Sequence, residues 1–378
     1  MANKKKADEG KVKVRDTEGG EELSGTLSEI GKRYGNVITA GSSAQQPDRI
    51  PTGAFMLDFC TLGGIPTSRI TKLVGQKHAG KSLTADKIIA SAQNLWPDRR
   101  VVKLDMEGTH ESVWSEKLGV NQDALLLAQP ETGEHALDMC DALIHTKEIS
   151  LIVVDSLAQL VPAKEMESSS EDQHVGLQSR LIGSFVRKAV SGMIAERRRG
   201  HQVTLLFINQ FRSKIGGWSP TGDPLTEPGG KGLGFAYSLE ITMKNKEQSG
   251  KDEHGIDSMT ENEHAFSITK NKLNGGPRTG EFRVRRIADE RLGLGIGDID
   301  DAETLLAYGK KFGVYTGGGS SWKLDFWDEE HSFGKLDDAV RQLYEDRNLY
   351  WKFRNYLICE QASHLGMPDS FLERFYPD

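Results

Sequence analysis

The feature that most constrains the fold is an eight-residue string, GQKHAGKS, at residues 75–82. It fits the pattern GxxxxGK[ST], follows an apolar run at residues 69–74 and opens a helical pattern at residues 81–94. In such a strand–loop–helix context, backbone N–H groups of the loop face phosphate oxygens, and the glycines allow that close approach. The sequence therefore predicts a phosphate-binding loop at the centre of an α/β fold.

Each residue of the loop is a candidate for nucleotide binding. The set is Gly75, Gln76, Lys77, His78, Ala79, Gly80, Lys81, Ser82 and Leu83. We expect Lys81 to neutralise phosphate charge and the Ser82 hydroxyl to ligate Mg²⁺. Asp155 closes the apolar run LIVVD and is the candidate second metal residue; an aspartate that caps a following helix is the alternative.

Hydrolysis of a nucleotide also needs a group that orients or deprotonates water. Glu107 follows the apolar run RVVKLD and is the candidate base, with a solvated loop glutamate as the alternative. Gln210 ends the run TLLFINQ, where its amide could sense the terminal phosphate. An ordinary pair of turn residues at positions 209–210 fits the same pattern.

Short apolar runs alternate with helical patterns from residue 50 onward, which predicts a mostly parallel sheet with helices on both faces. Strands are expected at residues 69–74, 100–104, 150–155, 203–209, 239–243, 265–269 and 281–285, and helices at 22–34, 81–94, 133–145 and 177–197. The last strands lack long helices between them, so we expect antiparallel hairpins there. Residues 336–362 are predicted to form one aromatic-rich helix.

Composition changes along the chain and predicts its organisation. We expect a flexible tail (residues 1–20), a helix with a linker (21–48), an ATPase-type core (49–290) and a small acidic C-terminal domain (291–378). The net charge of the chain is −7, but the last 92 residues hold 18 acidic and 10 basic residues. The acidity therefore belongs to the C-terminal part and does not exclude a nucleic-acid surface elsewhere.

Other classes of protein are disfavoured. No apolar run approaches the 18 or so residues that a membrane span needs, and residues 1–10 have no apolar core of a signal peptide. Cys60, Cys140 and Cys359 lie far apart, so neither a disulfide framework nor a four-cysteine zinc site is expected. The ten histidines show no HxxxH spacing. We expect a cytoplasmic location.

Longer stretches of the chain resemble the bacterial RecA recombinases, including phage-encoded relatives. The likeness runs through IPTGAFMLDFCTLGGIPTSRI, VWSEKLGVNQDALLLAQPETGEHALDMCDAL, LIVVDSLAQLVPAKE, HVGLQSR, LLFINQFRSKIG and TKNKLNGGPRTGEF. It covers residues 23–286 and continues more weakly to 362. The resemblance implies a RecA-like P-loop ATPase that binds ATP between protomers of a helical filament on single-stranded DNA. It also implies pairing with homologous double-stranded DNA and strand exchange.

The resemblance also implies roles for individual residues. The implied catalytic set is Glu107, Lys81, Gln210, Lys270 and Lys272. The two lysines of TKNK would reach the γ-phosphate of a neighbouring protomer, as an arginine finger does; a solvated strand end is the alternative. Trp114 would stack on adenine, although a core tryptophan fits as well, and Glu111 joins the nucleotide-binding set.

DNA binding is implied for two loops, at residues 165–180 and 211–234; the second is too long for a plain connection. The implied contacts are Val175, Gly176, Arg180, Arg187, Arg212, Lys214, Ile215, Gly229, Gly230 and Lys231. Phosphate contacts without base-edge readout give affinity without sequence preference. A solvated helix face is the alternative for Arg180 and Arg187. The helix at residues 23–34 resembles the family's polymerisation helix; a helix that caps its own core is the alternative.

The sequence also departs from the family. The loop interior QKHA replaces the usual PESS, and the first DNA loop is strongly acidic. Two other functions remain open: a ring-forming hexameric helicase with the same core fold, and a filament or mediator paralogue that does not hydrolyse ATP. Retention of Lys81, Glu107, Asp155 and Gln210 argues against the mediator.

Overall fold

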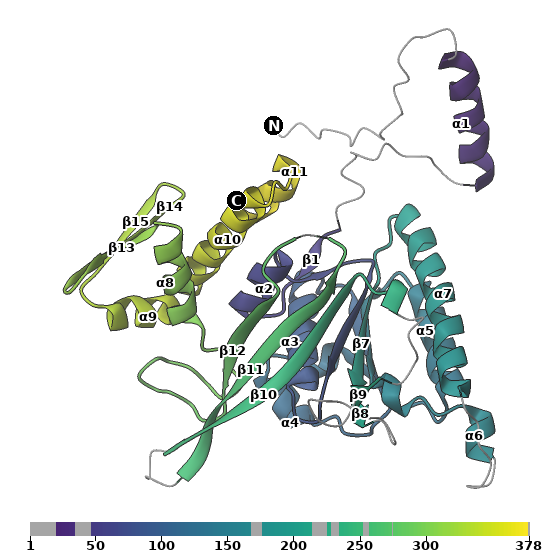
Figure 1. Cartoon of the computed structure of the whole chain (residues 1–378), viewed down its shortest axis with the longest axis horizontal. Helices are drawn as coiled ribbons and strands as arrows, with labels where there is room; N and C mark the ends of the chain where they lie inside the picture. Colours follow the sequence, from purple (N-terminus) through teal and green to yellow (C-terminus); the bar gives the residue numbers. More distant parts are fainter. Residues whose placement is uncertain are drawn as a thin grey trace. The chain divides into compact units, whose positions relative to one another are not determined.

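The chain is seen in a computed structural model that describes residues 20–34, 47–167, 176–213, 225–227, 234–251, 257–273 and 275–376 (Figure 1). Its contacts divide the chain into two units, Met1–Pro47 and Asp48–Asp378. The described part of the first unit is helix α1 (Gly20–Tyr34), which confirms the helix expected at residues 22–34. The boundary lies one residue before the predicted start of the core.

The second unit is built on an eight-stranded sheet in the order β12-β11-β10-β3-β7-β6-β4-β5. The strands are β3 (Ile70–Gly75), β4 (Arg100–Asp105), β5 (Leu125–Ala128), β6 (Ile149–Asp155), β7 (Thr204–Gln210), β10 (Leu239–Lys251), β11 (Asp257–Asn271) and β12 (Thr279–Arg285). Neighbours from β10 to β5 pair in parallel, and β11 and β12 add an antiparallel edge. The predicted α/β class is confirmed; the edge strand β5 was not expected.

Alternation of side chains along the strands divides the core into two layers. On β6, Leu151 and Val153 join the cluster that packs on α3, whereas Ile152 and Val154 join the cluster that packs on α5 and α7. Successive strand residues point to opposite faces, so this continuously apolar strand is buried on both. The helices concerned are α2 (Phe55–Thr61), α3 (Lys81–Leu95), α4 (Ser112–Lys117), α5 (Gly133–Ile144), α6 (Ala163–Glu167) and α7 (Leu177–Arg198).

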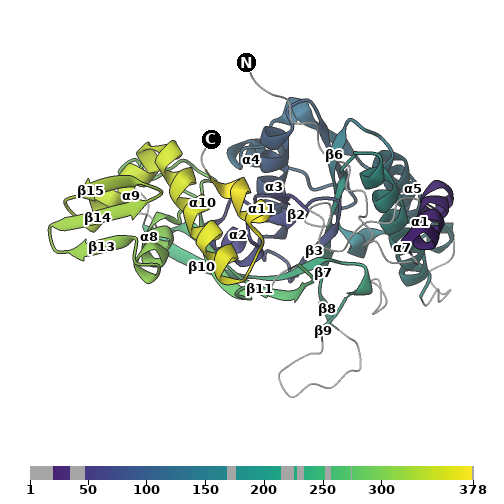
Figure 2. The same cartoon turned by 90° about the horizontal axis from the view of Figure 1, so that it is seen from above.

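The C-terminal elements gather at one end of the second unit, away from α5 and α7 (Figure 2). A three-stranded antiparallel sheet packs with the final helices. The elements are β13 (Tyr315–Gly318), β14 (Ser321–Phe326), β15 (Glu329–Phe333), α8 (Ala302–Lys311), α9 (Leu336–Glu345), α10 (Arg347–His364) and α11 (Asp369–Leu372). Their apolar residues are continuous with the core: Phe59 of α2 lies 4.8 Å from Tyr308 of α8, centroid to centroid.

The single helix predicted at residues 336–362 is wrong, because the chain breaks at Asp346. Asp346 leaves helical geometry (φ −100°, ψ 90°), and its side chain accepts a hydrogen bond from Leu349 N at 3.0 Å. That bond caps α10 and satisfies one of the N–H groups that a helix start leaves without a partner. Apolar periodicity on both sides of Asp346 conceals the break.

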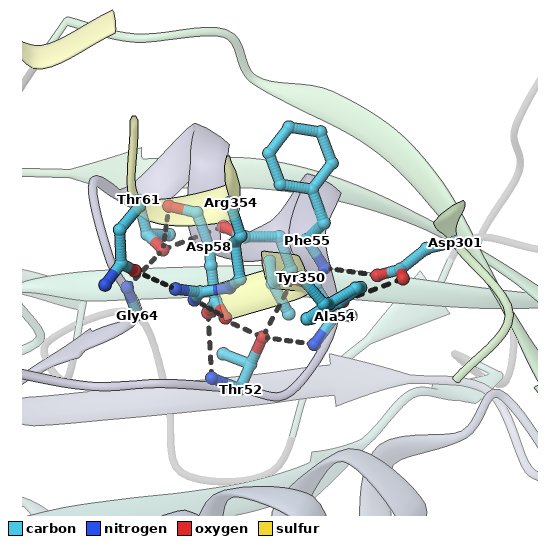
Figure 3. A network of polar contacts seen from close by, with 11 residues as sticks. Thr52, Ala54, Phe55, Asp58, Thr61, Gly64, Asp301, Tyr350 and Arg354 are labelled. Carbon is cyan, nitrogen blue, oxygen red and sulfur yellow. Dashed lines mark hydrogen bonds and ion pairs between the residues drawn. The ribbon is translucent and has the colours of Figure 1, made fainter. Parts of the chain in front are cut away.

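A buried polar network ties α10 to the segment around α2 (Figure 3). The Arg354 guanidinium forms an ion pair with Asp58, which also accepts hydrogen bonds from Thr52 N and Oγ at 2.8 and 2.7 Å. In the same figure, Asp301 accepts bonds from Phe55 N and Tyr350 Oη, both at 2.8 Å. Burial raises the pKa of Asp301 to about 6. The C-terminal elements are therefore joined to the core by charge as well as by apolar contact.

Short pairings complete the architecture: β1 (Arg49–Ile50) with β2 (Ile65–Pro66), and β8 (Arg212–Ser213) with β9 (Leu225–Thr226). Within the described parts of the chain, none of the helices has the length and apolar character that crossing a membrane would require.

Candidate active site

The loop between β3 and α3 leads into the start of α3, which is the strand–loop–helix arrangement that the GxxxxGK[ST] motif requires. Gly80 caps α3 with φ +86°, and a Cβ added there would come within 2.5 Å of the His264 ring beneath it. Only glycine fits both the left-handed backbone and this close approach. The loop lines a cavity of about 540 Å³, whose other walls come from the ends of β4, β6 and β7 and from β10 and β11.

Lys81 is almost fully buried at the start of α3, and its Nζ donates a hydrogen bond to Gln76 O at 2.7 Å. Burial lowers the pKa of Lys81, although the carboxylates of Asp155 and Glu107 act in the opposite direction. A polyanion in the cavity would compensate this desolvated ammonium group. The position suits phosphate binding on charge as well as on geometry.

Ser82 and Asp155, the predicted metal residues, meet at 3.0 Å, from Oγ to Oδ2. Asp155 ends β6 with 4% exposure, and burial raises its pKa, while Lys103 at 3.8 Å opposes that shift. A hydroxyl and a carboxylate are oxygen ligands of the kind Mg²⁺ takes alongside substrate phosphates. Among the described residues, no group of three His, Cys, Asp or Glu side chains could hold a metal alone. The pair therefore fits a cation that a nucleotide helps to ligate.

Glu107 lies just beyond the end of β4 and receives hydrogen bonds from two neighbouring strand ends. Ser156 Oγ, after β6, donates to Glu107 Oε1 at 2.8 Å, and Gln210 Nε2, at the end of β7, donates to the same oxygen at 2.5 Å. Because β4, β6 and β7 pair in parallel, their carboxyl ends lie together, and these three residues meet there. These two hydrogen bonds fix the position of Glu107, and its other carboxylate oxygen, Oε2, accepts neither of them.

Trp114 and Glu111, both on or next to α4, differ in placement. Trp114 is half-buried and lines the cavity, with the Arg286 guanidinium carbon 4.6 Å from its ring centroid. Glu111 is the exposed N-cap of α4, accepts a hydrogen bond from Val113 N at 3.2 Å, and is not among the residues that line the cavity. The structure brings Trp114, but not Glu111, to the phosphate loop's cavity.

Comparison with known proteins places the chain in a family. The model of the RecA N-terminal domain matches residues 21–286, which is most of the chain. The chain belongs to the RecA family. This family carries out DNA recombination and repair and binds ATP.

Individual relatives agree with this RecA membership. The chain is 33% identical to Protein RecA of Tropheryma whipplei over 336 residues, 88% of this chain and 71% of that protein. It is 36% identical to Protein RecA of Methylococcus capsulatus over 267 residues, 69% of this chain and 73% of that protein. It is 34% identical to Protein RecA of Chloroflexus aurantiacus over 298 residues, 78% and 80% of the two chains.

The two lysines implied by the RecA resemblance lie at the other end of the sheet from the phosphate loop. Asn271, between them, pairs with Leu239, which pairs with Thr71 near the start of β3. Lys270 Nζ donates to Gly234 O, and Lys272 Nζ donates to Phe235 O at 2.5 Å. Burial lowers the pKa of Lys270, and the Lys272 charge adds to that effect. Within one chain, Lys270 and Lys272 therefore do not reach the phosphate loop.

The residues expected to bind DNA are described only in part. Gly176 begins α7 at φ +83°, and Arg180 and Arg187 are exposed on that helix two turns apart, hence on one face. The backbone of Arg212 lies in β8. The remaining candidates, Val175, Lys214, Ile215, Gly229, Gly230 and Lys231, lie outside the described residues.

Sequence reasoning missed several residues of the cavity: Thr109, Asn245, Asn262, His264 and Arg286. Most lie on β10 or β11 or directly after β12, far from the loop in sequence. Burial lowers the pKa of His264 to about 4, so its ring is neutral beneath the loop at physiological pH. No local motif marks these positions, because the sheet register alone brings them to the cavity.

Proposed function

We propose that the chain is a DNA-dependent ATPase that polymerises on single-stranded DNA, pairs it with a homologous duplex and exchanges strands. The observation that carries the proposal is the position of Gln210. Its side chain bonds to Glu107, and the residue after it begins the segment at 211–234 that is expected to bind DNA. A shift of that segment on DNA would move a group that holds the candidate base.

The chain's own residues divide the work of hydrolysis. Lys81 and loop N–H groups would bind the phosphates, and Ser82 and Asp155 would hold a Mg²⁺ ion, which would supply positive charge beside the phosphates. Glu107 uses Oε1 for Ser156 and Gln210, which leaves Oε2 to orient water and accept its proton.

A second copy of the chain completes the proposed site. Lys270 and Lys272 cannot reach the loop of their own chain, because they lie at the opposite end of the sheet. In a head-to-tail assembly they would approach the γ-phosphate of the neighbour, where positive charge stabilises the transition state. Hydrolysis would then depend on assembly, and assembly on DNA.

DNA contacts complete the proposal. Arg180 and Arg187 share an exposed face of α7. The start of that helix is held to the segment that follows β6 by Gln178, whose Nε2 donates to Leu157 O, Ala158 O and Leu160 O at 3.0–3.3 Å. A DNA phosphate bound on this face would therefore contact a helix that hydrogen bonds join to the segment just after Asp155.

The test is ATP hydrolysis by the full chain with and without single-stranded DNA, together with D-loop formation between a labelled strand and a homologous supercoiled duplex. We expect single-stranded DNA to stimulate hydrolysis and ATP to be required for D-loops. Hydrolysis that DNA does not change, or the absence of D-loops under conditions where nucleotide binds, would refute the proposal. Lys81→Ala is the matched control and should abolish turnover.

A further inference from the structure

Four charged residues form a row at the end of the sheet that holds the two lysines proposed to act on a neighbouring copy. Lys72 on β3 pairs in register with Glu240 on β10, and Glu240 pairs with Lys270 on β11. Residues that pair across neighbouring strands point to the same face, so positive, negative and positive charges alternate there. Glu227, which follows β9, reaches Lys72 from the segment at 211–234 that is expected to bind DNA. We call Glu227, Lys72, Glu240 and Lys270 the charge row.

Lys72 is shared between two carboxylates. Its Nζ forms an ion pair with Glu227 Oε2 and a second with Glu240 Oε2 at 2.9 Å, and its side chain is only 5% exposed. The Tyr237 ring lies beside it, 5.0 Å from Nζ to the ring centroid. Attraction between charges is strong where water is excluded, so Lys72 holds both carboxylates. One lysine cannot neutralise two carboxylates, and Glu240 therefore keeps part of its charge.

Glu240 is held in place as a carboxylate. Its Oε1 accepts a hydrogen bond from Thr269 Oγ1 at 2.7 Å, while its Oε2 pairs with Lys72. Burial by itself would raise the pKa of Glu240, but the hydrogen bonds from Lys72 and Thr269 outweigh burial and lower that pKa. Glu240 is therefore negatively charged at neutral pH, directly beside Lys270 on the next strand.

The charge of Glu240 acts on Lys270. Burial lowers the pKa of Lys270 and the Lys272 charge adds to that effect, whereas the Glu240 charge opposes it. In the described parts of the chain Lys270 and Glu240 do not form an ion pair, and Lys270 Nζ donates to Gly234 O instead. A carboxylate of the same chain thus lies ready to pair with Lys270, and it would compete with the phosphate of a neighbouring copy.

We propose that Lys72 and Glu240 are positioning residues for Lys270, and that Lys72 decides whether Glu240 captures it. While Glu227 takes part of the Lys72 charge, Glu240 attracts Lys270. When DNA draws Glu227 away, Lys72 neutralises Glu240 alone, and Lys270 becomes available to the neighbour's phosphate. This inference rests on the proposed site between two copies and adds the route by which DNA acts on its lysine.

A charge row that only stabilises the sheet predicts a different result. Removing Lys72 would then lower the free energy of unfolding, and hydrolysis would fall only with the folded fraction. The proposal predicts instead that turnover falls in the folded, assembled chain and returns when Glu240 loses its charge as well. Turnover per assembled chain therefore separates the two roles.

The experiment compares Lys72→Met, the double variant Lys72→Met with Glu240→Gln, and Glu227→Gln. Lys323→Met is the control, because its ion pair with Glu330 at 3.0 Å is exposed on the C-terminal sheet. ATP hydrolysis is measured at saturating single-stranded DNA and, at chain concentrations that drive assembly, without DNA. Calorimetry gives the binding of Mg²⁺–ATP, sedimentation gives the assembled fraction, and thermal unfolding gives the folded fraction.

We expect Lys72→Met to lower DNA-stimulated turnover on the order of tenfold, with Mg²⁺–ATP binding and assembly unchanged. The double variant should return to within about twofold of the wild type, because the two losses are coupled and do not add. Glu227→Gln should raise hydrolysis without DNA, since Lys72 then serves Glu240 alone. Lys323→Met should behave as the wild type.

Wild-type turnover in Lys72→Met would overturn the proposal, and so would a double variant as slow as the single one or a Glu227→Gln chain without any gain. If Lys72→Met does not fold, Lys72→Gln replaces it, because glutamine keeps a hydrogen-bond donor and removes the charge. A wild-type chain whose hydrolysis DNA does not change would instead refute the proposed function.

Discussion

At the scale of single residues, the cavity holds two groups of opposite charge, and burial disfavours the charged form of each. Burial lowers the pKa of Lys81 and raises that of Asp155. A bound polyphosphate stabilises the charged lysine, and a bound cation stabilises the ionised aspartate. Each ligand alone would leave one of these groups uncompensated, so the proposed site would favour the metal–nucleotide complex as a unit.

The proposed role of Glu107 as the base gives a prediction at this scale. Glu107→Gln keeps the shape of the side chain but cannot accept a proton from water. We expect nucleotide binding to persist and DNA-stimulated hydrolysis to fall by about 10²–10⁴-fold. A coupled ATPase assay and nucleotide-binding titration measure the two effects. Glu116→Gln, exposed on α4, is the control and should behave as wild type; a Glu107→Gln chain that hydrolyses ATP normally would exclude this residue as the base.

At the scale of elements, the strands and helices around the phosphate loop follow from the sequence, because their apolar runs and turn residues are local signals. The ends of β10 and β11 do not follow from the sequence in this way. The sequence predicts strands at residues 239–243 and 265–269, whereas the two strands continue as a hairpin beyond β3 and pair mainly with each other. Polar residues there satisfy a ladder without apolar alternation, so periodicity stops before the strand does.

The candidate site shows the same division between local and long-range signals. Lys81, Ser82 and Asp155 are predictable because motif and strand end fix their places. His264 and Arg286 reach the cavity through the register of the antiparallel edge, which no short string of residues specifies. At Asp346 the local pattern is misleading instead: one capping residue interrupts the helix, although the apolar residues on both sides keep helical spacing.

The link between α10 and α2 gives a prediction for these elements. Arg354→Met leaves Asp58 buried without its cation, which we expect to lower the free energy of unfolding by about 3–5 kcal/mol. The control is Arg374→Met, whose ion pair with Asp48 is partly exposed; it should cost about 0–1 kcal/mol. Urea denaturation followed by circular dichroism measures both. Equal losses in the two variants would show that the buried pair is not what secures the C-terminal elements.

At the scale of the whole molecule, the central sheet carries different candidate functional residues at its two ends. The phosphate loop, Glu107 and Gln210 lie where the parallel strands end, and Lys270 and Lys272 lie beside the start of β3. A contact between one end of a copy and the other end of the next is heterologous: it repeats without closing on itself unless the rotation happens to form a ring.

Complementation between two inactive variants tests this arrangement. Lys270→Ala should bind nucleotide and lose DNA-stimulated hydrolysis, and Glu107→Gln should do the same for a different reason. In an equal mixture, a site with Glu107 of one copy and Lys270 of its neighbour forms in about a quarter of the contacts, so about a quarter of wild-type activity should return. Activity that does not return on mixing would show that Lys270 of one copy does not act on the site that holds Glu107 of its neighbour. Lys270→Arg is the control that keeps the charge.

In the proposed assembly, the opposed ends of the sheet would also make a row of copies directional. At one terminus the last copy would have a complete loop but no neighbour to supply lysines, and at the other terminus the lysines of the last copy would face solvent. The copy that lacks a neighbour to supply lysines would keep its nucleotide unhydrolysed, whereas copies inside the row would hydrolyse theirs. The two termini would then differ in how long a subunit stays bound, so growth and loss would run preferentially in one direction along the strand.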